Sequence, residues 1–237
     1  FGEVDENSLN RLEYAIGYLC HIYNPQSQRK YILLVDRFYD GYSRDTANGG
    51  NGKSLLVNTL GTLMNLTIVN GKEIKKDASS FKLAQVNNAT EIVHLDDAHS
   101  NFDADRMNPL VTGNFHIERK HKDPFSIPAQ DAPKIAVTTN HPIKGKGHTF
   151  KRRQFICEVG HYYRLQDENF GLTPRELHGC KDFPLPNQIN TEGEPFSWSK
   201  SDWNEFYRYV FRCIQKYLKD GLPSGGESYY YNLSLIH

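Results

Sequence analysis

Three short apolar runs, each followed by polar residues, limit most strongly what this chain can fold into. The runs are YILLV at 31–35, EIVHL at 91–95 and KIAVT at 134–138. Their length suits buried strands, because a helix of a globular protein needs about ten residues or more. Helical or looped segments separate the runs. The sequence therefore predicts an α/β fold with a central, mostly parallel sheet flanked by helices.

Helical periodicity appears at both ends of the chain. Residues 8–23 carry apolar side chains at helical spacing before Pro25, which predicts a helical lead-in. An aromatic stripe from Trp203 to Leu218 predicts a C-terminal helix with a capping box at 199–202 and Gly221 beyond its end. We interpret this stripe as a packing surface. A Pro- and Gly-rich connection at 165–196 completes the division that we expect, namely a lead-in at 1–28 that ends an upstream oligomerisation region, a core at 29–165, and a connection with a helical tail at 166–237.

Composition excludes several classes of protein. A hydrophobic content of 38% and a charged content of 24% are those of a folded globular protein. Lys plus Arg and Asp plus Glu both number 28, so no overall basic excess indicates a polyanionic partner. We expect no membrane span, since no apolar run approaches about 18 residues. The acidic start at Phe1 and the scattered cysteines predict a cytoplasmic portion of a longer polypeptide.

The segment ANGGNGKS at 47–54 follows the phosphate-loop pattern G-x-x-x-x-G-K-[ST], except that Ala47 stands at the first glycine. Small residues let backbone N–H groups turn toward phosphates at a helix N-terminus, and a helix is predicted at 53–66, followed by a strand at 67–69. We expect Lys53 to be exposed in the loop and to reach the β and γ phosphates of ATP, with the Ser54 hydroxyl on Mg²⁺. The predicted nucleotide-binding residues are Gly49, Gly50, Asn51, Gly52, Lys53 and Ser54.

Two features of this segment leave alternatives open. A Gly-rich turn before an ordinary helix would give a similar local sequence, although the preceding strand favours the phosphate loop. About ten residues, 37–46, intervene between strand and loop, where the loop usually begins directly after the strand. This insertion either wraps the nucleotide or reaches a neighbouring subunit.

Polar side chains end the other two buried strands. Asp96 and Asp97 follow the second strand, where one carboxylate suits Mg²⁺ and another suits the attacking water. We assign Asp96 to the metal and Asp97 to the attacking water. Both carboxylates belong to the predicted metal site, together with Ser54. Asn140 follows the third strand, where its amide can contact the water or the γ-phosphate. The alternatives are a solvated Asp-Asp turn and a turn asparagine before Pro142.

Positive charge gathers locally between residues 117 and 153. This segment contains nine basic and three acidic residues, so it carries net +6. Such a cluster favours contact with a polyanion, because neutralising phosphates releases counterions. The alternative is a solvated charged surface.

The order of these elements resembles the ATPase domain of superfamily 3 helicases, part of the AAA+ class of P-loop ATPases, and especially primase-helicases of phages, plasmids and large DNA viruses. The similarity rests on GGNGKS at 49–54, on Asp96-Asp97 as Walker B, and on KIAVTTN at 134–140 as motif C with Asn140 as sensor. It implies that IERKHK at 117–122 forms a hairpin whose residues Lys120, His121 and Lys122 contact DNA in the channel of a ring. It also implies that Arg152 and Arg153 supply an arginine finger to the neighbouring subunit.

The resemblance implies an ATP-dependent replicative DNA helicase from a bacterium, phage or plasmid. It would act on single-stranded or forked DNA as a homo-oligomer, expected to be a hexameric ring, with a primase domain upstream on the same polypeptide. One alternative is a nucleic-acid-dependent AAA+ ATPase that loads or remodels other proteins without unwinding. Another is an inactive ATP-binding scaffold in which Ala47 has ended turnover.

Overall fold

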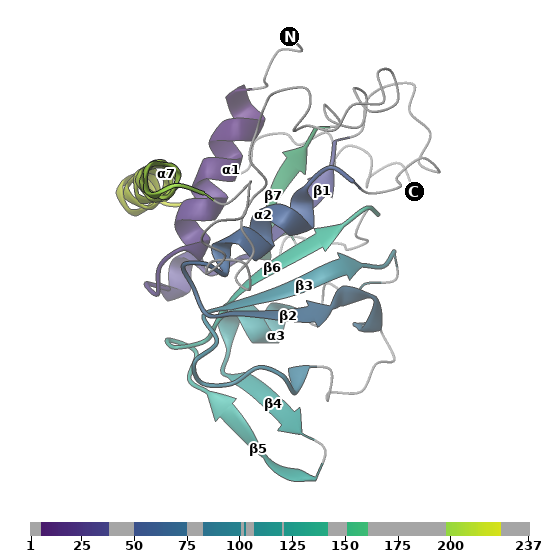
Figure 1. Ribbon diagram of the computed structural model, residues 1–237. Coiled ribbons are helices and arrows are strands. Elements are labelled where there is room, and N and C mark those ends of the chain that lie inside the picture. The colour runs from purple at the N-terminus through teal and green to yellow at the C-terminus, as the bar shows by residue number, and fades with distance from the viewer. Residues whose placement is uncertain are drawn as a thin grey trace.

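A parallel sheet forms the centre of the computed structural model, which describes residues 6–37, 50–74, 83–100, 102, 107–119, 121–141, 151–160 and 198–223. Within these ranges five strands pair in the order β2-β3-β6-β1-β7, every neighbouring pair being parallel (Figure 1). The predicted α/β fold with a parallel sheet is therefore confirmed. The strands are β1 (Tyr31–Asp36), β2 (Leu66–Asn70), β3 (Ile92–Ala98), β6 (Lys134–Thr139) and β7 (Gln154–Val159).

The two faces of the sheet carry separate hydrophobic clusters, because successive side chains of a strand point to opposite faces. Ile32 and Leu34 face the helices α1 (Glu6–Leu19), α2 (Lys53–Leu60) and α7 (Lys200–Asp220). Tyr31, Leu33 and Val35 face the other cluster, which includes α3 (Met107–Thr112). Both faces of β1 are thus buried, as its unbroken apolar run predicted.

A two-stranded hairpin, β4 (Phe115–Arg119) and β5 (Lys122–Ile127), extends away from the sheet (Figure 1). Its base is fixed by buried Phe115, Ile117 and Ile127, which belong to the same core cluster as Leu33. The Arg119 guanidinium lies over the Phe125 ring at 4.4 Å and donates to the Val86 carbonyl at 3.1 Å. The hairpin that the resemblance implied is therefore present.

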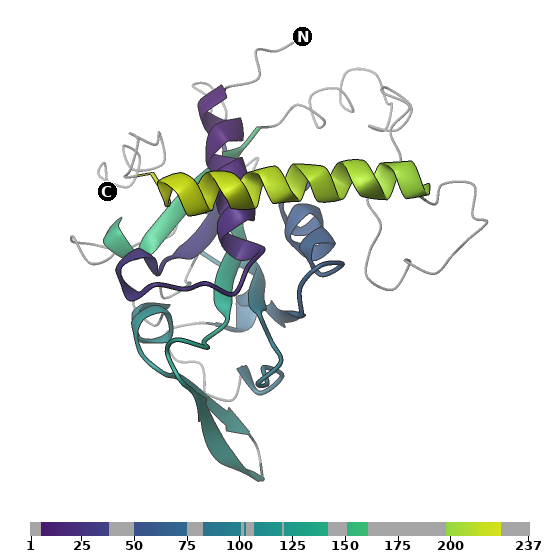
Figure 2. The ribbon, with the colours of Figure 1, turned by 90° about the vertical axis from the view of Figure 1, so that its left-hand side faces the viewer.

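The lead-in and C-terminal helices cross each other on one face of the molecule (Figure 2). Gly17 makes the crossing close, since a Cβ added there would lie 2.0 Å from the Cys213 carbonyl oxygen. Tyr14 Oη donates to Asp220 at 2.9 Å, and the Tyr18 and Tyr217 rings meet edge to face at 5.5 Å. As predicted, the Ser199–Asp202 capping box begins α7 and Gly221 follows its end.

The structure corrects three sequence predictions about helices. The lead-in helix ends at Leu19 and not at residue 23, because the buried Lys134 ammonium binds the carbonyls of Tyr18 and His21. The phosphate-loop helix ends at Leu60 and not at residue 66, where the chain tightens into turns that begin at Gly61. The stripe of α7 is only partly a packing surface, since Phe211 and Leu218 are exposed.

Two 3₁₀ helices complete the elements of the described chain. They are η1 (Gln26–Gln28) and η3 (Gly71–Glu73), the second of which packs beneath the end of β3. Cys20, Cys157 and Cys213 are buried free thiols. The helices in the described ranges are all too short or too polar to cross a membrane. The division of the chain at residues 28 and 165 stays a prediction.

Candidate active site

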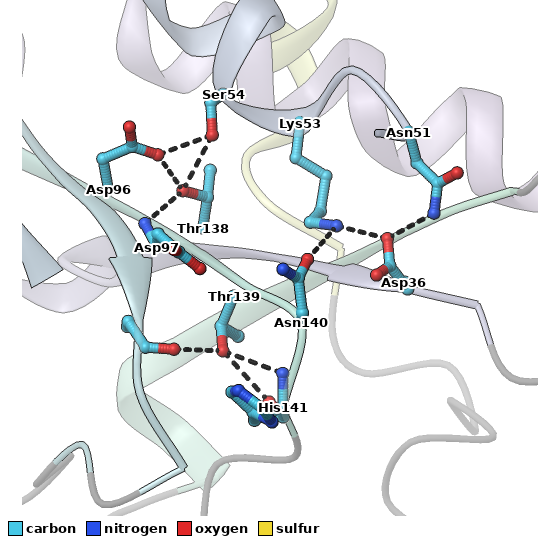
Figure 3. A network of polar contacts seen from close by, with 11 residues as sticks. Asp36, Asn51, Lys53, Ser54, Asp96, Asp97, Thr138, Thr139, Asn140 and His141 are labelled. Atoms are coloured by element: carbon cyan, nitrogen blue, oxygen red, sulfur yellow. Dashed lines mark hydrogen bonds and ion pairs between the residues drawn. The ribbon is translucent and has the colours of Figure 1, made fainter. Parts of the chain in front are cut away.

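A cleft of about 540 Å³ opens at the carboxyl ends of the central strands. It brings together three segments that are distant in sequence, namely the start of α2, the end of β3 and the end of β6 (Figure 3). The strands β1, β3 and β6 are neighbours and parallel, so the polar residues that follow them meet at one edge of the sheet. The lining residues are Gly50, Asn51, Gly52, Lys53, Ser54, Leu55, Asp96, Asp97, Thr138, Thr139 and Asn140.

The glycine-rich loop enters α2 through two residues with positive φ, Gly50 at 86° and Gly52 at 80°. A side chain at either position would meet open space, so the left-handed backbone and not crowding makes glycine necessary. Lys53 and Ser54 are then the first two residues of α2, at the positive end of its dipole. Gly49 and Ala47 lie outside the described residues, as does most of the insertion at 37–46.

Lys53 is buried, which corrects the expectation that it is exposed in the loop. Its ammonium forms an ion pair with Asp36 at the end of β1 and donates to Asn140 Oδ1 at 2.8 Å (Figure 3). Asn51 Nδ2 donates to the same Asp36 oxygen at 2.7 Å. The second carboxylate oxygen, Asp36 Oδ2, is buried and lacks a hydrogen-bond partner among the described residues. Asp36 is therefore the anionic partner that compensates the buried Lys53 charge.

Ser54 and Asp96 form the second polar group of the cleft. Ser54 Oγ donates to Asp96 Oδ1 at 2.5 Å, and Thr138 Oγ1 donates to the same oxygen at 2.8 Å. Burial alone would raise the pKa of Asp96, but these two hydrogen bonds together with nearby His94 outweigh it, so the pKa is lowered. Asp96 is therefore a carboxylate at neutral pH.

Asp97 leaves the strand with a left-handed backbone, at φ 53°. Its backbone N–H donates to Thr138 Oγ1 at 3.2 Å, and its carboxylate forms an exposed ion pair with Lys72 of η3 at 2.5 Å. The hydrogen bond and charge of Asp97 raise the pKa of Lys72. Gly71 lets η3 approach this closely, since a Cβ there would lie 2.7 Å from the Asp96 carbonyl oxygen.

His94 lies behind the carboxylates and is fully buried. Its Nε2 is 3.1 Å from Thr138 Oγ1, and its Nδ1 is 2.8 Å from the side chain of Asn58 on α2. Burial lowers the pKa of His94 to about 4, although Asp96 opposes the shift. The ring is therefore neutral at pH 7 and links α2 to the two central strands.

The donor set fits a hydrated magnesium ion carried by a phosphate ligand. Among the described residues no cluster of three or more His, Cys, Asp or Glu side chains could hold a metal ion alone. Mg²⁺ instead takes one or two protein oxygens and keeps waters and phosphate oxygens as its other ligands. Ser54 Oγ and Asp96 Oδ1 are adjacent at the cleft wall and offer such a pair.

The remaining sequence-predicted residues lie away from the cleft or outside the described chain. Arg152 and Arg153 precede β7, whose start pairs with the start of β1, so they lie at the edge of the sheet opposite to the cleft. His121 is exposed at the tip of the hairpin with φ 59°. Lys120 lies outside the described residues, and Lys122 begins β5 with its side chain not described.

Sequence reasoning missed Asp36, Lys72, His94 and Thr138. Asp36 and Lys72 are single polar residues next to strands, and only the fold reveals that they face Lys53 and Asp97. Thr138 and His94 lie inside apolar runs, where a polar residue buried on both sides needs a partner. The need of such a residue for a polar partner could therefore have pointed to His94 and Thr138 from the sequence.

Comparison with known proteins gives three findings. The model of a family of unknown function, DUF5906, matches residues 46–153. No curated protein matches the sequence. The fold is similar to that of the apo NrS-1 C-terminal region (TM-score 0.45, 15% identity, covering 93% of this chain and 43% of that one). It is also similar to the fold of the JCV helicase crystallised with a small-molecule acetamide (TM-score 0.41, 12% identity, covering 88% of this chain and 61% of that one). The chain thus spans less than two thirds of either structure.

Proposed function

We propose that this chain is an ATP-hydrolysing domain of the AAA+ class. The observation that carries the proposal is the meeting of Lys53 and Ser54, at the start of α2, with Asp96 and Asn140 in one cleft. Each of these side chains has the chemistry that phosphoryl transfer needs, and the parallel strands explain why they meet.

The residues of this cleft have separate roles in the proposed hydrolysis of ATP. Backbone N–H groups at the start of α2 and the Lys53 ammonium would bind the β and γ phosphates of ATP. Ser54 and Asp96 would hold a Mg²⁺ ion, which would supply neutralising charge to those phosphates. Asp97 orients the attacking water and accepts its proton, while Asn140 contacts the γ-phosphate. The water oxygen forms a bond to phosphorus as the bond to the bridging oxygen breaks, and ADP leaves with the electron pair.

We further propose that hydrolysis drives movement along and unwinding of single-stranded or forked DNA within a homo-oligomeric ring, expected to be a hexamer. The support is the projecting hairpin with exposed His121 at its tip, where Lys120 and Lys122 flank His121 in the sequence. The sequence resemblance to superfamily 3 helicases supports it too, and suggests an upstream primase domain. A loader or remodeller without unwinding is the second candidate, since the same hairpin would serve it.

The first experiment measures ATP turnover with and without single-stranded DNA. Because Lys53 is buried against Asp36, its removal alone would leave a buried charge unpaired. We therefore compare Asp36→Asn/Lys53→Ala with Asp36→Asn, and use Lys200→Ala on the exposed start of α7 as a control. Loss of turnover only in the variant without Lys53 is expected. Turnover that persists without Lys53, or wild-type protein that neither binds nor hydrolyses ATP, contradicts the proposal.

A strand-displacement assay then separates the two candidates. A helicase releases the displaced strand in an ATP-dependent manner, whereas a loader hydrolyses ATP without release. Lys120→Ala/His121→Ala should weaken DNA binding at all sequences and keep DNA-independent ATP turnover. The salt dependence of binding should flatten by about one unit of slope for each phosphate that the variant no longer neutralises. Unchanged DNA affinity at two salt concentrations would show that the hairpin tip is a solvated charged surface and not a DNA contact.

A further inference from the structure

The end of β3 contains a bulge, and Thr138 on β6 lies opposite to it. Leu95 pairs with Val137 and Ala98 pairs with Thr139, so Asp96 and Asp97 together face the single residue Thr138. Bulges of this kind redirect side chains and occur beside active sites, although they are rare between parallel strands. In a regular strand two successive side chains point to opposite faces. Here both carboxylates line the same cleft.

The Thr138 hydroxyl contacts Asp96, Asp97 and Ser54 at this bulge (Figure 3). Its hydrogen goes to Asp96 Oδ1, because an ionised carboxylate can only accept. Its oxygen accepts from the backbone N–H of Asp97, which a regular strand would pair with a backbone carbonyl. His94 Nε2 also lies 3.1 Å from the same oxygen.

We propose that Thr138 is a positioning residue, which fixes the bulge and thereby sets both carboxylates against the metal and the attacking water. One hydroxyl holds the side chain of Asp96 and the backbone of Asp97, so the two assigned roles depend on one atom. His94 Nε2 contacts that hydroxyl from behind, and Asn58 Oδ1 on α2 lies 2.8 Å from His94 Nδ1. This inference rests on the proposed ATP hydrolysis.

The test compares Thr138→Val, which keeps the shape and removes the hydroxyl, with Thr138→Ser, which keeps the hydroxyl. Thr67→Val is the matched control, since Thr67 on β2 contacts Thr90 outside the cleft. The first measurement is equilibrium binding of a fluorescent ADP with and without Mg²⁺. The second is kcat and the KM for ATP, and the third is thermal unfolding.

In Thr138→Val the gain in affinity that Mg²⁺ gives should fall about 10- to 100-fold, as should kcat, because outer-shell partners of metal ligands typically contribute this much. Metal-free ADP affinity should stay within about threefold, since Lys53 and the loop are untouched. Thr138→Ser should restore both quantities, and Thr67→Val should change neither. A role in stability alone would instead lower the unfolding temperature and leave the Mg²⁺ dependence unchanged.

The outcomes separate this inference from the proposed function. Wild-type turnover that requires Lys53, together with an unchanged Mg²⁺ dependence and kcat in Thr138→Val, overturns the positioning role alone. Absence of Mg²⁺-dependent binding and turnover in the wild-type protein overturns the proposed function itself. If Thr138→Val fails to fold, Thr138→Ala serves for the same comparison with Thr138→Ser. Equal behaviour of the Ala and Ser variants would then refute the role of the hydroxyl.

Discussion

At the scale of single residues, the ion pair with Asp36 explains how Lys53, to which we assign phosphate binding, is kept in a folded core. An ammonium out of water needs a partner, and Asp36 provides it at the end of β1. Under the proposed function, phosphate would compete with this carboxylate for the Lys53 ammonium.

Asp36→Asn should strengthen nucleotide binding, because the amide competes with phosphate less well than the carboxylate does. We expect ADP affinity to rise about 5- to 10-fold, and the nucleotide-free protein to lose about 1–3 kcal/mol of its free energy of unfolding. Calorimetric titration and urea unfolding measure the two effects. Asp131→Asn on the exposed surface is the control. Unchanged or weaker ADP binding would show that Asp36 does not compete with phosphate.

Buried neutral His94 should make the protein sensitive to acid. Its folded pKa of about 4 lies below the ordinary 6.5, so the unfolded state binds the proton more tightly. This contribution to stability is complete above about pH 6.5 and is lost as the pH falls toward 4, by about 3 kcal/mol in total. In urea unfolding series from pH 7 to 4.5, His94→Gln should reduce the slope of stability against pH, whereas exposed His116→Gln should not. Equal slopes in the wild-type protein and in His94→Gln would contradict the claim that buried neutral His94 causes the acid sensitivity.

The sequence predicts the polar side chains that end strands or begin α2, since parallel strands bring such ends together. Lys53, Ser54, Asp96 and Asn140 accordingly share the cleft. Although Asp36 also ends a strand, the sequence does not predict it as the partner of Lys53, because the insertion at 37–46 separates the two residues and the pattern leaves the path of that insertion open. Nor does it predict Thr138 as a shared hydrogen-bonding residue, because the bulge opposite to it has no sequence signature.

At the scale of elements, the crossing of α1 and α7 depends on one glycine. In an isolated helix Gly17→Ala would stabilise by about 1 kcal/mol. Here the new Cβ would lie 2.0 Å from the Cys213 carbonyl oxygen, and backbone atoms cannot move aside as a flexible side chain would. Overpacking of this kind typically costs about 1–3 kcal/mol.

We therefore expect Gly17→Ala to lower the free energy of unfolding by about 2 kcal/mol, measured by urea unfolding. Asn10→Ala, at a partly exposed position of the same helix, should be neutral or slightly stabilising. If Gly17→Ala were as stabilising as it is in an isolated helix, the two helices would not pack as closely as described.

Element boundaries were less predictable than element types. Long periodic segments such as α7 carry their own capping residues, so both ends of α7 could be predicted. The end of α1 depends on Lys134, which comes from another element more than a hundred positions later. The strand β7 was not predicted from the sequence. Its residues QFICEV mix apolar and polar types without a clear pattern, and only their pairing with β1 identifies them as a strand.

At the scale of the whole molecule, Arg152 and Arg153 lie one strand length from the cleft, which is about 20 Å for the six residues of β7. They cannot reach the cleft of their own chain across that length. If either acts on ATP, it acts on the site of a neighbour. This arrangement fits the proposed ring.

Mixing two inactive variants tests the shared site. Arg153→Ala and Asp36→Asn/Lys53→Ala should each lose most of their turnover, since an arginine finger contributes about 10³ to 10⁵ in rate. In an equal mixture about a quarter of the interfaces join an intact loop to an intact arginine, if subunits exchange freely around a cyclic ring. ATP turnover should then reappear. Verified subunit exchange without recovered turnover would contradict a site shared between chains.

The crossing of α1 and α7 also determines when the chain can finish folding. Tyr14 and Asp220 are 206 residues apart, so their contact closes a very long loop of the chain. Contacts of such long range form slowly, because the loop must close before the contact can stabilise it. During synthesis α1 is made before α7, so α7 cannot cover the apolar face of α1 until it too has left the ribosome. Until then the nascent chain carries an uncovered hydrophobic helix, which is the kind of surface that chaperones bind.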